Sequence, residues 1–129
     1  MCGVAGFLMD SKSSSSVNFD LITKKMTDSI KHRGPNDSGC WNNPSDGIAL
    51  GHRRLSILDL SDAGHQPMES SNGRYVIAFN GEIYNHLQIR SDIEKNNENL
   101  SWKGHSDTET ILNAFETFGI QKSLEKFVG

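Results

Sequence analysis

The spacing of apolar positions changes several times along the chain, and it predicts a mixture of strands and helices. Residues 2–8 form a short apolar run with two glycines, and residues 75–80 alternate between two faces, as a half-buried strand does. Residues 48–52 and 55–60 are two further apolar runs. We expect all four segments to be strands, with a basic pair separating the last two.

A helical spacing follows the first predicted strand. From residue 20 to about 31, the apolar side chains of Ile22, Met26 and Ile30 recur every four positions, which predicts a helix that buries this face. Residues 32–39 contain a proline and two glycines, and they end that helix.

The clearest helix signal lies near the end of the chain. Ser106 and Glu109 have the spacing of a capping box, which predicts that Ser106 caps a helix, and Gly119 is a typical stop. A shorter helix is expected over residues 87–94. The apolar stripe of the capped helix consists of Ile111, Leu112, Phe115 and Phe118.

Because strands and helices do not alternate regularly, an α+β fold is favoured over a doubly wound parallel sheet.

Composition narrows the class of protein. The chain has 129 residues, enough for one domain, and 13 basic against 16 acidic side chains give a net charge of −3, which argues against nucleic-acid binding. Its apolar runs fall short of the ~18 residues of a membrane span. Neither a secretory signal nor a metal-ligand spacing is evident, so we expect a cytoplasmic chain with reduced thiols and no metal.

Cys2 directly follows the initiator methionine, and its thiol has two interpretations. It is either an inert small residue or a reactive group. If Met1 is removed, the same residue carries a thiol and a free α-amine, whose ordinary pKa of about 7.7–8.0 lets it accept a proton near neutral pH. Nucleophile and base would then come from one residue.

Asn80 and Gly81 follow the predicted strand over residues 75–80, and they also have two interpretations. Asn-Gly is the strongest short signal for a two-residue hairpin turn. The Asn side-chain amide and the Gly backbone N–H are also two donors that could face one developing oxygen charge, as in an oxyanion hole. A tight turn would hold both donors rigid, so the interpretations are compatible.

The remaining polar candidates each have a structural and a functional interpretation. Arg53 and Arg54 are either a solvated pair on a strand edge or a guanidinium fork for a carboxylate. Asp107 either complements a helix dipole or binds a substrate ammonium group. Cys40 is expected to be structural. The five histidines are expected to make local hydrogen bonds; they are His32, His52, His65, His86 and His105.

The order and combination of these features resemble one family. The matching segments are MCGVAGF, HRGPNDSG, GHRRLSILDLSDAGHQPM, FNGEIYNH and SDTETIL, which run from residue 2 to about 112. They resemble the glutamine amidotransferase domain of glutamine-hydrolysing asparagine synthetases, a class II domain with an N-terminal nucleophile. The resemblance implies an N-terminal-nucleophile α-β-β-α sandwich of mostly antiparallel sheets, with Cys2 on an inner strand.

The resemblance implies catalytic roles for individual residues. Cys2 matches the nucleophile that attacks the side-chain amide of glutamine after Met1 is removed. Asn80 and Gly81 match the groups that bind the oxyanion. Arg33 and Gly34 match a loop near the nucleophile. Asn36 stands where that loop normally has Asp, and we expect this change to retune the site modestly.

The resemblance also implies how glutamine is held. Arg54 matches the residue that binds the α-carboxylate, while Glu82 and Asp107 match positions that receive the α-ammonium group. A site with these opposite charges would select free glutamine over glutamine within a peptide. The pocket wall continues from Arg54 through Leu55, Ser56, Ile57 and Leu58. Asn80 and Gly81 are also expected to contact glutamine.

Partners and cofactors follow from the resemblance as well. L-glutamine is the expected substrate, and the ammonia would pass to a synthetase domain or subunit that makes asparagine from aspartate. We expect no cofactor in the amidotransferase part, with ATP and magnesium confined to the synthetase domain. The family domain continues beyond the match, so residues 1–129 are expected to be its N-terminal part, incomplete at the C-terminus and without the synthetase domain.

Three alternatives stay open from the sequence. The ammonia could serve another acceptor, as in an asparagine synthetase-like amidotransferase for a polysaccharide or natural product. The chain could be a catalytically silent interaction module. It could also hydrolyse amides other than glutamine, although the pairing of Arg54 with Asp107 disfavours this.

Overall fold

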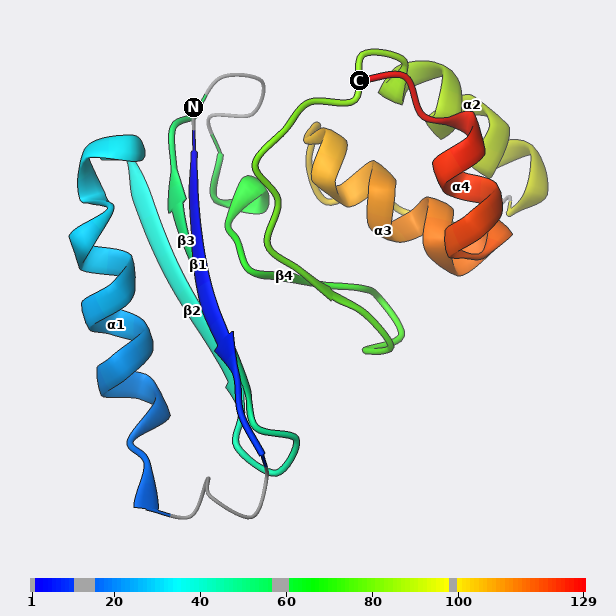
Figure 1. The fold of residues 1–129 in the computed structure, drawn as a ribbon. Helices are drawn as coiled ribbons and strands as arrows, with labels where there is room; N and C mark the ends of the chain where they lie inside the picture. The colour runs from blue at the N-terminus through cyan, green and yellow to red at the C-terminus, as the bar shows by residue number, and fades with distance from the viewer. Residues whose placement is uncertain (1, 11–15, 57–60, 98–99) are drawn as a thin grey trace. The chain divides into compact units, whose positions relative to one another are not determined.

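The computed structural model describes residues 2–10, 16–56, 61–97 and 100–129, and it confirms an α+β fold with antiparallel sheets (Figure 1). The chain forms two compact units, which we describe separately. The first contains the described residues up to Ser56 together with His65–Pro67 and Ala78–Asn80. The second contains residues 61–64, Met68–Ile77 and Gly81–Gly129.

A three-stranded antiparallel sheet forms the centre of the first unit. Its strands are β1 (Gly3–Leu8), β2 (Asp37–Asn43) and β3 (Ile48–Arg54), in the order β1-β3-β2. The register pairs Gly3 with Arg53 and Asp37 with Arg54. Within the described residues β1 pairs only with β3, so the expected inner position for the strand next to Cys2 is not met there.

Helix α1 (Phe19–Ser29) covers one face of this sheet, as Figure 1 shows, but it does not bury the predicted face. Its buried residues are Phe19, Thr23 and Thr27, whereas Ile22 is 39% exposed. The threonines can be buried because each hydroxyl donates to the carbonyl oxygen four residues earlier, at 2.7 Å. A Cβ at Gly51 of β3 would lie 2.1 Å from the Thr27 hydroxyl, so the glycine permits this close packing.

The segment around the basic pair also differs from the prediction. Strand β3 runs through both arginines to Arg54, so they do not separate two strands. β3 is the central strand, and each arginine is only 8% exposed, which excludes a solvated pair on a strand edge. Leu55 and Ser56 lie beyond the strand, and residues 57–60 of the expected second strand lie outside the described residues.

The second unit is mainly helical. It contains α2 (His86–Asn96), α3 (Asp107–Phe118) and α4 (Ile120–Lys126), with a short antiparallel pair of β4 (Met68–Glu69) and β5 (Val76–Ile77). Its core cluster is Ile89, Ile93 and Ala114. The Ser106 cap is confirmed, because its hydroxyl oxygen accepts the Glu109 N–H, and Gly119 ends α3 with a φ of 81°.

The strand expected over residues 75–80 is shorter than predicted, and the prediction of a hairpin turn after it is wrong. Only Val76 and Ile77 pair as a strand, and Asn80 and Gly81 lack the positive φ angles of a type I′ turn. The chain continues instead toward α2, and the Ile83 N–H bonds to the Asp107 carboxylate at 2.9 Å. Within the described residues, none of the helices is long and apolar enough to cross a membrane.

Candidate active site

Cys2 lies at the end of the sheet, one residue before β1. Its half-buried Sγ atom accepts the Leu55 N–H at 3.4 Å, and its S–H group lies 3.6 Å from the Leu55 carbonyl oxygen. Continuing the β1–β3 register places Cys2 opposite Arg54. The thiol is therefore fixed against the backbone that immediately follows the second arginine of the pair.

Two glycines allow the segment of residues 31–36, which begins with a 3-10 helix over Lys31–Arg33, to approach this end of the sheet. A Cβ at Gly3 would lie 3.0 Å from Cβ of Arg33, and one at Gly34 would lie 2.5 Å from the Arg53 carbonyl oxygen. The Asn36 N–H donates to the Arg54 carbonyl oxygen at 3.1 Å. Residues 31–36 therefore lie next to the end of the sheet at which Cys2 stands, as the resemblance implied for Arg33 and Gly34.

Asn36, which stands in place of the Asp expected from the resemblance, accepts a backbone hydrogen bond with its side-chain amide oxygen. Its Oδ1 atom accepts the Ser56 N–H at 3.1 Å. A carboxylate oxygen at this position could accept the same bond, so the change removes a charge without removing the acceptor. Asn36 therefore helps to hold Ser56, one of the predicted wall residues.

The two arginines of the basic pair lie on opposite faces of β3. The Arg53 side chain donates to the Thr27 carbonyl oxygen at 3.1 Å and pairs with Asp28, so it belongs to the face that α1 covers. Since side chains alternate along a strand, Arg54 belongs to the other face, on which Cys2 also falls by register. By register, Arg54 is therefore the arginine of the pair that shares a face of the sheet with Cys2.

A segment of residues 78–80 lies against the same face of β3 through His52. The His52 ring is fully buried, and its Nε2 atom lies 3.1 Å from the Phe79 carbonyl oxygen. Among the residues that the structure describes, its buried Nδ1 atom has no hydrogen-bond partner. Burial disfavours the charged imidazolium and holds the pKa of His52 below its usual value of 6.5, although the bond to Phe79 opposes this shift.

The predicted ammonium-binding residues come together in the second unit. Asp107, 7% exposed at the start of α3, accepts the Ile83 N–H at 2.9 Å, which holds the segment of Gly81 and Glu82 beside α3. The Tyr84 N–H donates to the Val128 carbonyl oxygen at 2.7 Å, so residues 126–129 run alongside this segment. Glu82 itself is exposed.

The structure therefore groups the predicted site residues in two sets. Cys2, Arg54, Leu55 and Ser56 gather at one end of the sheet, and the exposed Asn80 belongs to the same unit. Gly81, Glu82 and Asp107 belong to the second unit. Ile57 and Leu58 lie outside the described residues.

The expectation of a local hydrogen bond is wrong for His52, because its partner Phe79 is 27 residues away. Gln66, for which no prediction was made from the sequence, contacts the same residue next to Asn80. Gln66 accepts the Phe79 N–H through Oε1 at 2.7 Å. For His52 a signal was present, since strand alternation places it on the same face as Arg54. For Gln66 nothing in its local sequence indicates a partner thirteen residues away.

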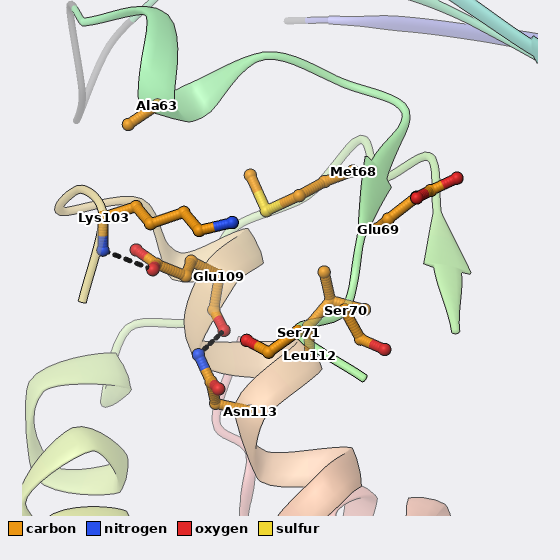
Figure 2. Close-up of a pocket in the computed structure, with 9 residues that line it drawn as sticks. All are labelled: Ala63, Met68, Glu69, Ser70, Ser71, Lys103, Glu109, Leu112 and Asn113. Carbon is orange, nitrogen blue, oxygen red and sulfur yellow. Dashed lines mark hydrogen bonds between the residues drawn. The ribbon is translucent and has the colours of Figure 1, made fainter. Parts of the chain in front are cut away.

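The second unit also contains an open pocket that none of the predicted site residues lines. Its empty volume is about 370 Å³, which includes space that is open to solvent (Figure 2). The Glu109 carboxylate beside it accepts the Lys103 N–H at 2.7 Å and the Gly104 N–H at 3.0 Å, so it stabilises the loop before α3. The lining residues are Ala63, Met68, Glu69, Ser70, Ser71, Lys103, Glu109, Leu112 and Asn113. Across the described ranges, no three His, Cys, Asp or Glu side chains are grouped to hold a metal ion.

The match to a known family is consistent with this arrangement. The model of the glutamine amidotransferase domain family matches residues 1–129, and the chain belongs to that family. This is a family of enzyme domains that use glutamine as a nitrogen donor, as the sequence motifs indicated.

Individual proteins are also similar to this chain over most of its length. Asparagine synthetase (glutamine-hydrolyzing) 2 of Bacillus subtilis is 37% identical over 93% of this chain, and asparagine synthetase (glutamine-hydrolyzing) 1 of the same organism is 32% identical over 92%. Amidase chry2 of Gibberella zeae is 30% identical over 93% of the chain. The chain spans only 15% to 18% of the length of these three relatives.

Proposed function

We propose that this chain hydrolyses the side-chain amide of L-glutamine to glutamate and ammonia, with Cys2 as the nucleophile. The observation that carries the proposal is the fixed position of the Cys2 thiol against Leu55, beside the buried Arg54. Membership of the glutamine amidotransferase family supports the choice of substrate.

The first half of the reaction forms a thioester. Removal of Met1 frees the α-amine of Cys2, which takes the thiol proton, and the thiolate attacks the amide carbon of glutamine. The Asn80 side-chain amide and the Gly81 N–H stabilise the resulting oxyanion. The ammonium form of the α-amine returns its proton to the departing nitrogen, the C–N bond breaks and ammonia leaves.

The second half hydrolyses that γ-glutamyl thioester. Water loses a proton to the α-amine and attacks the same carbon, so the oxyanion forms again at Asn80 and Gly81. Breakage of the C–S bond releases glutamate, and the thiolate recovers the proton. The cycle therefore balances with water as the only co-reactant and with no cofactor in this part of the protein.

The α-carboxylate and α-ammonium groups of glutamine would bind to opposite charges. Arg54 at the end of β3 offers a largely desolvated guanidinium group to the carboxylate. The proposed adjoining wall is Leu55, Ser56, Ile57 and Leu58, of which the last two lie outside the described residues. Asp107 already accepts one backbone N–H, but a carboxylate has further acceptor sites that can receive an ammonium group. Glu82 lies in the segment that Asp107 holds and would supply a second negative charge.

The wider role of the protein follows from its relatives. We infer an α-β-β-α sandwich of the N-terminal-nucleophile type. The ammonia would pass to a synthetase domain or subunit that uses ATP and magnesium to make asparagine from aspartate in the cytoplasm. The names of the Bacillus subtilis proteins support this acceptor.

A second candidate is an amidotransferase of the same kind that serves another acceptor. The similarity to amidase chry2 of Gibberella zeae supports it, because that relative is not named as an asparagine synthetase. The glutamine half-reaction would be the same in both cases.

The proposed substrate is tested by the charge requirement at both ends of glutamine. The purified chain is incubated with L-glutamine or with N-acetyl-glutamine, and released ammonia is measured. We expect ammonia from glutamine and at least about tenfold less from the blocked compound, because it lacks the ammonium group. Equal rates would exclude the charge-selective site, and no ammonia from either compound would support the silent module.

A further inference from the structure

Two buried side chains hold the backbone of Phe79 from both sides. The Phe79 N–H donates to Oε1 of Gln66 at 2.7 Å, and the Phe79 carbonyl oxygen lies 3.1 Å from Nε2 of His52. Gln66 is 7% exposed and His52 is fully buried. Both polar groups of the residue immediately before Asn80 are therefore satisfied by side chains rather than by a partner strand.

The geometry also fixes the tautomer of His52. A carbonyl oxygen can only accept a hydrogen bond, so the Nε2 atom must carry the proton. The buried Nδ1 atom has no partner within the described ranges, so we assign it as the unprotonated nitrogen of a neutral ring. A neutral ring at this position is expected, because a buried imidazolium would leave a second N–H group without an acceptor.

His52 and Gln66 together form what we call the Phe79 clamp, and it is anchored to two strands of the sheet. His52 lies in β3, where the register pairs it with Val4 of β1 and Gly39 of β2. A Cβ at Gly39 would lie 2.2 Å from the Gln66 carbonyl oxygen, so the segment that carries Gln66 rests directly on β2. The neighbouring His65 bonds to Asp37 at the start of β2 at 2.7 Å.

We propose that His52 and Gln66 are positioning residues that fix the Asn80 side-chain amide for the oxyanion, an assignment that rests on the proposed function. The carbonyl group held by His52 belongs to the peptide that joins Phe79 to Asn80, and the N–H held by Gln66 belongs to the peptide before it. Both peptide planes that lead into Asn80 are thereby fixed to the sheet. Oxyanion donors are effective only when they are preorganised, so a loosened Asn80 lowers the rate of the chemical step.

The test compares variants that keep or remove the two bonds. His52→Leu and Gln66→Met remove one bond each while keeping most of the side-chain volume, whereas His52→Gln offers an N–H near the position of Nε2. Thr23→Val is the matched control, because Thr23 is equally buried but packs on the α1 face of the sheet. For each variant we would measure kcat and KM for glutamine hydrolysis and the exchange rate of the Phe79 amide by NMR.

A second readout separates positioning of the oxyanion site from general damage. Alkylation of the Cys2 thiol by iodoacetamide needs no oxyanion stabilisation, and it can be followed by mass spectrometry of the N-terminal peptide in a Cys40→Ser background. A variant that is merely unfolded would alter this rate as well as kcat.

We expect His52→Leu and Gln66→Met to lower kcat about 10- to 100-fold, with KM within about threefold and an unchanged alkylation rate. The Phe79 amide should exchange faster in both variants, while His52→Gln and Thr23→Val should stay close to wild type. Unchanged kcat in His52→Leu beside an active wild type would overturn the positioning roles alone. A wild-type chain that releases no ammonia would overturn the proposed function and these roles with it.

Discussion

The Sγ atom of Cys2 lies 3.4 Å from the backbone nitrogen of Leu55, the residue that follows the end of β3. This contact ties the start of the chain to the strand that carries both His52 and Arg54. The proposed nucleophile, the proposed carboxylate-binding residue and one half of the Phe79 clamp thus depend on the placement of a single central strand.

The first prediction concerns the α-amine of Cys2. A variant that retains Met1 places this nitrogen in a peptide bond, where it can no longer accept the thiol proton. We expect its glutaminase activity to fall at least about 100-fold, close to the loss in a variant without the thiol. The mass of the intact chain reports whether Met1 is present, and full activity of a chain that retains it would exclude the amine as base.

The second prediction uses the opposite orientations of Arg54 and Arg53. Arg54→Lys keeps the charge but loses the forked geometry, so we expect KM for glutamine to rise about tenfold or more. Arg53→Lys disturbs the contacts with Thr27 and Asp28, so it should lower the melting temperature while KM stays within about twofold. Steady-state kinetics and thermal unfolding measure both, and the reverse pattern would show that the assignment of the two arginines is wrong.

The third prediction concerns Asp107. Asp107→Asn retains an oxygen that can accept the Ile83 N–H, so the fold around α3 should persist. The lost negative charge should raise KM for glutamine about tenfold or more while KM for N-acetyl-glutamine changes little. Equal effects on both substrates would point to a structural role at the helix start, and circular dichroism checks that the helix remains.

The fourth prediction follows from the lowered pKa of His52. Its folded-state pKa lies below the usual 6.5, so the unfolded chain takes up a proton first as the pH falls. Neutral His52 makes its full contribution to the free energy of unfolding above about pH 6.5. This contribution declines as the pH falls from there toward the folded-state pKa. Asp37, Arg54 and His65 are the charged groups that modulate this value.

Urea unfolding of wild type and His52→Gln at about pH 7.5 and about pH 5.5 checks this prediction. The wild type should lose more free energy of unfolding than the variant between the two pH values, because glutamine does not titrate. An identical loss in both proteins would mean that His52 does not titrate differently in the folded and unfolded states.

Sequence patterns predicted those parts of the fold that depend on local signals. The strand at residues 2–8 and the Ser106-capped helix are confirmed, because their patterns act within a few residues. The buried face of α1 was predicted wrongly, because its packing depends on Gly51 in a strand distant in the sequence. The predictions of a strand after Ile77 and of a hairpin at Asn80 were wrong for a similar reason. The backbone groups of Phe79 bond to the side chains of His52 and Gln66, which lie elsewhere in the sequence.

The site residues were predicted mainly from the resemblance to a known family. Local sequence alone could not show which of Arg53 and Arg54 faces the Cys2 side of the sheet. Adjacent residues of the same type look equivalent in the sequence, whereas strand alternation gives them different partners once β3 is known to be central. His52 and Gln66 could not be singled out, because their roles depend on a third segment.

The role of Cys2 as nucleophile is decided by ammonia release from L-glutamine in wild type, Cys2→Ala and Cys40→Ser, each with Met1 removed. We expect wild type and Cys40→Ser to release ammonia at similar rates, because Cys40 is exposed and its Sγ atom contacts the Thr27 hydroxyl on the face that α1 covers. We expect Cys2→Ala to release none above background. Ammonia release by Cys2→Ala at the wild-type rate would contradict this role.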